Sequence, residues 1–265
     1  MKITLPVFAE YDTFIDAIAE AERLFLKGNA APSELSGIEK ALSSYPDAEL
    51  IANGSGYGPR LAAVREQLKK AFELLKAALS DYIYVPSINL YVAKQRTLHG
   101  ETWPDTHEKL QSQGSRMLII PEFITFVKYL KQGYPDRTEA ESIRDDILTA
   151  RNPYRAEWLD ADFKVVNEIP RINYNHKIVN GILQPQNSEP LESCLMKDCK
   201  VDLASFNRQG LPTKKGNDLN YWFPRLDNNS VARFVANSGR AGLDCYGDPQ
   251  NSDSALGVRR AKNFP

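Results

Sequence analysis

The sequence predicts an α+β protein with a helical segment over residues 1–80 and an α+β domain over residues 81–265. Three observations predict this order. Apolar residues recur at helical spacing up to about residue 80. Runs rich in β-branched and aromatic residues begin directly afterwards. From about residue 163 onward, short strand-like runs alternate with loops that contain many Asn, Gly and Pro residues.

The N-terminal segment shows its clearest helix after Pro59, which suits the first turn of a helix. One apolar stripe follows it, made of Leu61, Val64, Leu68, Phe72, Leu75 and Leu79. An earlier stripe at helical spacing contains Phe14, Ile18, Ala21 and Phe25. The glycine-rich run at 54–58 lacks the Lys-Ser/Thr pair of a phosphate-binding loop, so we interpret it as a linker.

The larger domain opens with two predicted strands, at 81–86 and 88–92. A helix is then expected from Pro121 to Gly133, because these two residues are typical of a helix start and a helix end. Thr138-Glu-Ala-Glu141 has the form of a capping box, which predicts a second helix there.

Charge and hydropathy exclude several function classes. Lys and Arg number 33 against 34 Asp and Glu, a net charge of −1, so the whole chain has no electrostatic footprint for nucleic acid. No apolar run approaches the roughly 20 residues that span a bilayer, so no membrane insertion is expected. The first residues lack the pattern of a Sec signal peptide. Localisation is left open, with the cell surface and a virion both compatible.

Histidines and carboxylates raise the question of a metal site. His99 and His107 lie near Glu101, Asp105 and Glu108, and such side chains are ligands for zinc or harder ions. Their spacing matches no metal-binding motif, and the third histidine, His176, is distant in the sequence. We therefore expect no metal and no cofactor.

Catalytic groups are equally weakly indicated. Glu157, Asp160 and Asp162 place three carboxylates within six residues, and two of them as a pair could perform acid–base chemistry. The intervening Trp158 and Leu159 instead favour a structural turn buried against the core. Cys194, Cys199 and Cys245 are interpreted as reduced thiols, with an optional Cys194–Cys199 bridge as the alternative. No Ser-His-Asp or Cys-His arrangement is evident, and the chain is not expected to be an enzyme.

The segment from Leu226 to Ser254 combines an apolar frame with short polar and aromatic residues. As strands, its inward positions would be Ala232, Phe234, Ala236, Ala241, Leu243 and Cys245. The outward positions would be Val231, Arg233, Val235, Arg240, Gly242, Asp244 and Tyr246. Residues of this outward kind occur in antibody binding loops. Periodicity alone leaves two interpretations open, a binding surface and an ordinary solvated sheet face.

Three stretches together resemble one family. Arg155-Ala-Glu-Trp-Leu-Asp-Ala161 resembles the Ala-Glu-Trp-x-x-Ala signature of C-type lectin folds of the formylglycine-generating-enzyme type. Leu256-Gly-Val-Arg-Arg-Ala261 is similar to their closing strand, and the expected helix at 121–132 falls where their first helix would be. The frame around Val231–Phe234, Cys245 and Pro249 resembles the variable proteins of diversity-generating retroelements, most closely the archaeal and archaeal-virus branch.

This resemblance implies a C-type lectin fold over about residues 81–265, with a C-terminal variable region over about 226–254. In that family an error-prone reverse transcriptase copies the region from a template repeat and substitutes bases at adenines. An asparagine codon of the template can therefore become a codon for Tyr, Asp, Ser, Gly, His and a restricted set of other residues. The residues that match this set and would bind ligand are Leu226, Val235, Ser238, Gly239, Gly242, Asp244, Tyr246, Gly247, Asp248, Asn251 and Asp253. Lys214, Lys215, Trp222 and Gln250 would be scaffold, while Asn228 and Asn229 are left open.

The function implied is recognition of a protein or glycan ligand on a host or neighbouring cell surface. Calcium-dependent lectin activity is not expected, because the calcium–sugar motifs of classical lectins are missing from the sequence. Two alternatives stay open: an oxidase of the formylglycine-generating type that uses the cysteines, and a structural virion or surface protein. The oligomeric state is not predicted.

Overall fold

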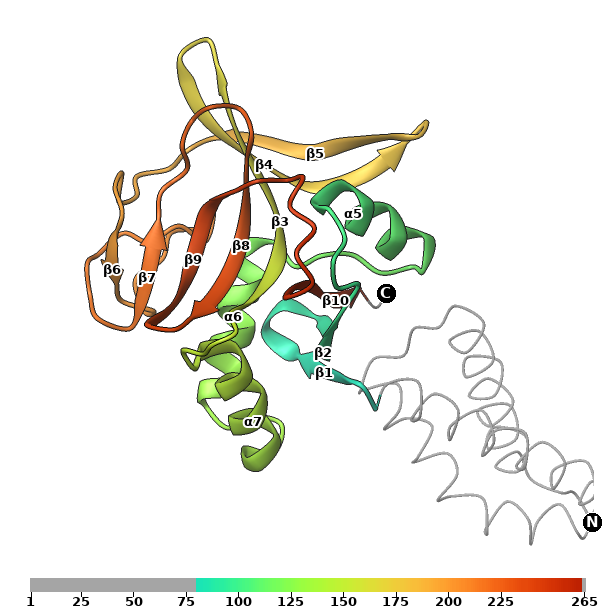
Figure 1. The fold of residues 1–265 in the computed structure, drawn as a ribbon, viewed down its shortest axis with the longest axis vertical. Coiled ribbons are helices and arrows are strands. Elements are labelled where there is room, and N and C mark those ends of the chain that lie inside the picture. Colours follow the sequence, from blue (N-terminus) through green and yellow to red (C-terminus); the bar gives the residue numbers. More distant parts are fainter. Residues whose placement is uncertain (1–79, 264–265) are drawn as a thin grey trace, which may run out of the picture. The chain divides into compact units, whose positions relative to one another are not determined.

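The computed structural model describes residues 80–263 (Figure 1). The expected N-terminal helices and the 54–58 linker lie outside the described residues. Within residues 80–263 the helices are α5 (Trp103–Ser112), α6 (Ile120–Lys131), α7 (Arg137–Leu148) and the short 3-10 helix η1 (Pro86–Ile88). The strands are β1 (Tyr82–Val85), β2 (Leu90–Thr97), β3 (Arg155–Val166), β4 (Ile169–Val179), β5 (Ile182–Pro190), β6 (Cys199–Val201), β7 (Leu219–Trp222), β8 (Ser230–Asn237), β9 (Arg240–Gly247) and β10 (Leu256–Asn263). This mixture, mostly sheet with three α-helices, confirms the α+β class for the described part.

Strand β3 is the centre of the sheet. The strands follow the order β1-β2-β10-β3-β8-β9-β7-β6. Strand β8 pairs antiparallel with one edge of β3. The other edge is shared: β10 pairs parallel with Ala156–Trp158, and β4 pairs antiparallel with Asp162–Val166. Because β4 continues past β3 and pairs with β5, the β4–β5 hairpin projects from the main sheet (Figure 1).

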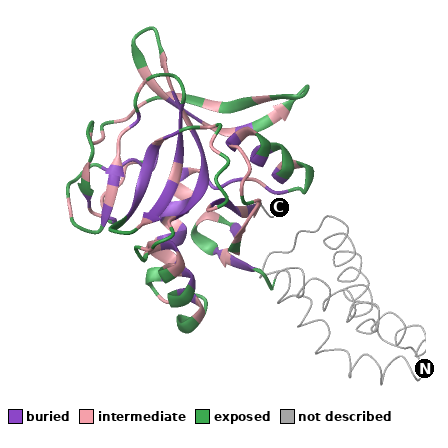
Figure 2. Cartoon of the chain, in the orientation of Figure 1, coloured by how far each residue is buried: buried purple, intermediate pink, exposed green. Residues whose placement is uncertain are grey.

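One face of the sheet packs against α6 and α7 and forms the larger apolar core. The inward residues of β8 and β9 predicted from the alternation, Ala232, Phe234, Ala236, Ala241, Leu243 and Cys245, all belong to this core. Phe234 meets Phe123 of α6 with ring centroids 4.9 Å apart. Figure 2 shows the buried residues concentrated along these central strands. The predicted frame of the C-terminal strands is confirmed.

The opposite face of β3, β8 and β10 packs a second, smaller apolar cluster beneath α5. Its members are Trp103, Leu110, Met117, Ala156, Trp158, Val231, Val235, Leu256 and Val258. Helix α5 also packs on β4 and β5. The β4–β5 hairpin and α5 therefore cover this face of the sheet at β3.

Several element predictions hold and others need correction. The helix expected at 121–132 is α6, and the helix expected near Thr138 is α7. The N-cap of α7 is Asp136, whose side chain accepts a hydrogen bond from the Glu139 amide at 3.0 Å. The run Glu157–Asp162 is part of β3, so the prediction of a turn there is wrong, although burial against the core is correct.

Candidate functional site

The side of β7, β8 and β9 that faces away from α6 carries Trp222, Arg233, Arg240, Asp244 and Tyr246, which we call the outer face. Their sequence neighbours Tyr221, Phe234, Ala241, Leu243 and Cys245 point into the larger core, so alternation directs these five outward. Arg240 lies over the Trp222 ring with 5.2 Å from its guanidinium carbon to the centroid. Arg225, from the β7–β8 loop, lies over the Tyr246 ring at 4.5 Å. Both arginines are exposed, so the two pairs border solvent.

Arg233 and Asp244 form an ion pair in the middle of the outer face. Arg233 Nε donates to Asp244 Oδ2 at 2.8 Å, and the other carboxylate oxygen accepts from the Tyr246 amide at 2.9 Å. Asp244 is 4% exposed. Its oxygens are therefore occupied within the fold, and its part is to hold the sheet rather than to meet a ligand.

Four residues predicted for the ligand-binding surface prove to be buried, so their assignment to an exposed surface is wrong: Val235, Gly242, Asp244 and Gly247. Val235 belongs to the smaller apolar cluster. A Cβ atom at Gly242 would lie 2.2 Å from the carbonyl oxygen of Asn220 on β7, and one at Gly247 would lie 3.0 Å from that of Val231. Parallel pairing with β7 thus leaves no room for a side chain at Gly242.

The other residues predicted for the surface are accessible. Ser238, Gly239, Asp248 and Asp253 are exposed, and Leu226, Tyr246 and Asn251 are half-buried. Ser238 and Gly239 form the β8–β9 turn, whereas Asp248, Asn251 and Asp253 lie on the loop from β9 to β10. With Leu226 on the β7–β8 loop and Tyr246 on β9, these residues reach solvent from three separate loops and one strand, and they do not converge on one pocket.

Asp253 lies at a cleft of about 800 Å³ lined by Arg96, His99, Arg151, Tyr154 and Arg155, among others. The guanidiniums are engaged within the fold. Arg96 donates to the carbonyl oxygens of Ala156 and Ala255, both at 2.8 Å. Arg155 donates to Glu157 at 2.9 Å. The cleft is therefore lined by cationic groups that tie β2, β3 and the loop before β10 together.

A buried polar cluster lies between α5, β3 and β4, where His107, Asp160 and His176 meet. His176 Nδ1 is 2.5 Å from Asp160 Oδ1, and His107 Nε2 is 3.7 Å from the same oxygen. All three residues are at most 6% exposed. One nitrogen from each histidine and one Asp160 oxygen lie within 4.8 Å of one another. These are the residue types that hold zinc and related ions in proteins.

Burial and neighbouring charges shift the pKa values of the two histidines in opposite directions. Burial lowers the pKa of the His107 imidazole to about 4, although Asp160 opposes this shift. Burial also disfavours charge on His176, but the Asp160 and Asp162 carboxylates raise the pKa of its imidazole to about 9. Near neutral pH, His107 is therefore neutral and His176 carries the charge that balances Asp160.

Local backbone features bring these side chains together. The register between β3 and β8 shifts between Trp158 and Asp162, and the Asp160 amide donates instead to Leu118 at 2.8 Å. Asn175 has a φ of 56° directly before His176, a conformation that asparagine tolerates better than most residues. The Gln111 side chain on α5 donates to the His176 carbonyl at 3.0 Å and accepts from the Ile178 amide at 2.9 Å.

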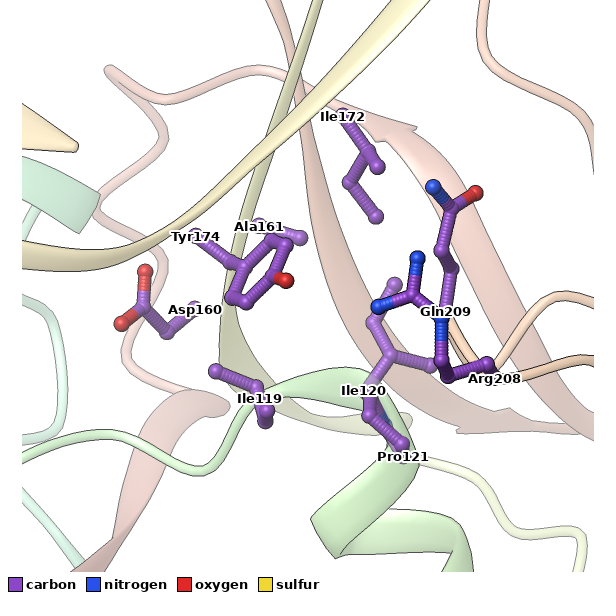
Figure 3. Close-up of a pocket in the computed structure, with 9 residues that line it drawn as sticks. All are labelled: Ile119, Ile120, Pro121, Asp160, Ala161, Ile172, Tyr174, Arg208 and Gln209. Atoms are coloured by element: carbon purple, nitrogen blue, oxygen red, sulfur yellow. The ribbon is translucent and has the colours of Figure 1, made fainter. Parts of the chain in front are cut away.

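Asp160 also lines a small cavity of about 190 Å³, shown in Figure 3, together with Ile119, Pro121, Ile172, Tyr174 and others. The figure shows the Asp160 carboxylate turned away from the Tyr174 ring. The cavity and the histidine cluster thus lie on different sides of the Asp160 side chain.

Sequence reasoning missed the histidine cluster. His107 was grouped with His99, Glu101, Asp105 and Glu108, and the structure does not bring these into one cluster with it. His99 packs against Gly257 of β10 instead. One available signal was helix α5, which begins with the Thr102 N-cap and Pro104 and places Trp103, His107 and Leu110 on its buried side.

The three cysteines, all within the described residues, are unbridged, so no Cys194–Cys199 disulfide forms. Cys245 is fully buried, as expected, whereas Cys194 and Cys199 are half-buried. Burial raises the pKa of the Cys194 and Cys245 thiols. Both therefore stay protonated near neutral pH, which disfavours thiolate chemistry.

Comparisons of this chain with protein-family models, with curated proteins and with solved structures found no match. Among residues 80–263, no helix is long and apolar enough to span a membrane.

Proposed function

We propose that this chain is a non-enzymatic ligand-binding protein whose C-terminal surface is diversified on a C-type-lectin-like scaffold, as in the variable proteins of diversity-generating retroelements. The observation that carries the proposal is the division of β8 and β9 into two sides. Their inward residues fill the core, while the accessible residues lie on the outer face and on the adjoining loops. Surface substitutions of this kind usually change stability by less than about 0.5 kcal/mol.

The composition of the accessible surface supports binding. Trp, Tyr and Arg residues dominate the energetics of protein interfaces. Here Trp222, Arg240 and Tyr246 lie on the outer face, and Arg225 covers Tyr246 from the β7–β8 loop. The stacked guanidiniums hold both rings in place, which lowers the entropy cost of using them as contacts. Ser238 and Asp248 add short polar groups on the flanking loops.

The lectin-like scaffold is supported by the neighbourhood of its two motifs. Ala156–Trp158 of the Ala-Glu-Trp motif pairs in parallel with Leu256–Val258 of the closing Gly-Val-Arg strand. Glu157 and Arg259, one from each motif, form a buried ion pair at 3.1 Å. Because these motif residues make the contacts between β3 and β10, the loops and the outer face can vary without loss of those contacts.

The coding DNA gives the most direct test. A near-copy of the segment that encodes about residues 226–254, differing mainly at adenines and close to a reverse transcriptase gene, is expected. Differences should concentrate at codons for accessible residues such as Ser238, Tyr246 and Asp248, and should spare the Gly242 codon, because no side chain fits there.

A binding experiment tests the surface itself. The full chain would be applied to arrays of glycans and of cell-surface proteins, beside a Ser238→Ala, Tyr246→Ala, Asp248→Ala triple variant. A matched control changes three exposed residues of α7, Thr138, Glu141 and Ser142, to Ala. The first variant should lose the signals that the control keeps. Equal binding by all three proteins, at equal thermal stability, would exclude this surface as the site.

A further inference from the structure

The buried histidine cluster has the composition of a metal site. Imidazole nitrogen suits zinc and neighbouring first-row divalent ions, and an aspartate oxygen completes a common mixed donor set. His107 projects from α5, Asp160 from β3 and His176 from β4, so three separate elements converge on one point. The Trp103 ring packs against both imidazoles, with its centroid 4.4 Å from that of His107 and 4.9 Å from that of His176, and gives the cluster an apolar side.

One donor atom in the cluster lacks a partner. His107 Nε2 is buried without a hydrogen bond, and its side chain is only 1% exposed. Its nearest acidic oxygen, Asp160 Oδ1, is too distant at 3.7 Å for a hydrogen bond. A polar atom buried in this way costs about 1–3 kcal/mol unless something binds it, and a cation at this point would use its lone pair.

The surrounding hydrogen bonds hold the donors in place. The His176 amide donates to Asp160 Oδ2 at 3.0 Å, which leaves Oδ1 directed at the two imidazoles. Asp162 Oδ1 is also buried without a hydrogen bond and lies 3.6 Å from His176 Nε2. With His176 bound to a metal through Nδ1, its Nε2 hydrogen would face Asp162. This is the carboxylate–histidine–metal arrangement that orients ligands in known sites.

The distances fit a cation after a small adjustment. Zinc binds nitrogen and oxygen at about 2.0–2.2 Å, so two donors of a tetrahedral site lie about 3.4 Å apart. The His107–Asp160 separation of 3.7 Å is close to this value. The His176–Asp160 separation of 2.5 Å has to lengthen by roughly 1 Å, with the Nδ1 hydrogen displaced by the metal.

We propose that His107, Asp160 and His176 bind one zinc ion or a similar first-row divalent ion, with Asp162 as a positioning residue. The site is enclosed, so the ion enters as α5 closes over β4 during folding. Its binding then holds α5 and the β4–β5 hairpin onto the main sheet. The proposal gives zinc a structural role that supports the hairpin, with one water as the fourth ligand, because the three side chains supply three of the four ligands of a tetrahedral site.

The test uses the full chain, unfolded in guanidinium with a chelator and refolded either with zinc or with chelator alone. The zinc-refolded protein should retain about one zinc per chain after desalting, as measured by elemental analysis, and should melt at a higher temperature. His107→Phe and Asp160→Asn should retain less than about a tenth of that zinc. The matched control His99→Phe should retain it all, because His99 lies apart from the cluster.

Asp162→Asn distinguishes positioning from a merely structural role, because it should fold and still weaken zinc affinity by about 10–100-fold. A second measurement does not depend on whether the ligand variants fold: the wild-type chain is refolded with cobalt in place of zinc. Its visible bands should show nitrogen and oxygen ligation, and its near-ultraviolet spectrum should lack the thiolate charge-transfer band that binding to Cys194 or Cys199 would give. The proposal is overturned if the wild type retains no zinc, if His107→Phe retains as much as the wild type, or if the cobalt spectrum is that of a thiolate site. The first outcome would leave the cluster as an ion pair alone.

Discussion

Arg259 donates from Nε to a carboxylate oxygen of Glu157 at 3.1 Å, and this buried contact joins β10 to β3. Arg155 donates to the other oxygen at 2.9 Å. Glu157 is fully buried, so the two guanidiniums supply the charge balance that water would otherwise provide. The last strand of the domain is thereby held at the centre of the sheet by a carboxylate from the first half of the domain.

Acid should weaken this link. Burial raises the pKa of Glu157, but Arg259 and Arg155 outweigh it and hold the pKa below its usual value of 4.5. Because the folded-state pKa lies below the unfolded-state value of 4.5, the stabilisation is complete above about pH 4.5 and is lost as pH falls through the folded-state pKa. Urea unfolding from pH 7 to about pH 3 should show this loss in the wild type. Glu157→Gln should lower the free energy of unfolding at pH 7 by about 3–5 kcal/mol and flatten its dependence on acid. The exposed Glu141→Gln serves as control, and an unchanged acid slope in Glu157→Gln would contradict the assignment.

Two glycines of the β8–β9 hairpin should differ in how much an added methyl group destabilises the protein. Gly242→Ala places Cβ against the Asn220 carbonyl and should destabilise the protein by more than about 2 kcal/mol, because backbone must move. Gly239→Ala meets nothing within 4 Å and should change stability by less than about 0.5 kcal/mol. Thermal unfolding of the two variants measures the difference. Equal melting temperatures would show that β7 does not pack as described.

The Arg233–Asp244 pair should be coupled in a double-mutant cycle. Asp244→Ala leaves the Arg233 guanidinium and the Tyr246 amide without their acceptor, and should cost about 1–3 kcal/mol. The Arg233→Ala, Asp244→Ala double variant should cost less than the sum of the two single changes. Strict additivity would indicate independent surface residues, as the sequence pattern had suggested.

Leu226 occupies a backbone conformation that suits asparagine. Its φ of 57° lies in the left-handed region, which costs a bulky residue about 1–2 kcal/mol. Leu226→Asn should therefore raise the melting temperature, whereas Asp227→Asn, next to it in sequence, should not. A lower melting temperature for Leu226→Asn would show that packing of the leucine side chain outweighs the strain.

Much of the fold follows from local sequence patterns. The apolar alternation of Val231–Ala236 and Arg240–Tyr246 identified the core side of both strands, because the period of a strand leaves one assignment that buries Phe234 and Leu243. Pro121 and Gly133 placed the two ends of α6 within two residues. Such patterns report on which side of an element is buried, and they act over a few residues.

Solvent exposure on the outer side was harder to predict. Val235 and Gly242 alternate with core residues and were therefore expected to be exposed, but α5 covers the first and β7 approaches the second. Neither neighbour is adjacent in the sequence. Which outward residues reach solvent depends on what else packs on the sheet.

The sequence by itself determined the α+β class, the core sides of β8 and β9 and the helices α6 and α7, because propensity and periodicity act locally. The tertiary structure decided that His107, Asp160 and His176 meet, that Glu157 pairs with Arg259, and that Asp244 and Gly242 are buried. These contacts join residues that are mostly distant along the chain. Their proximity results from strand pairing and from α5 closing over β4, and no local pattern encodes it.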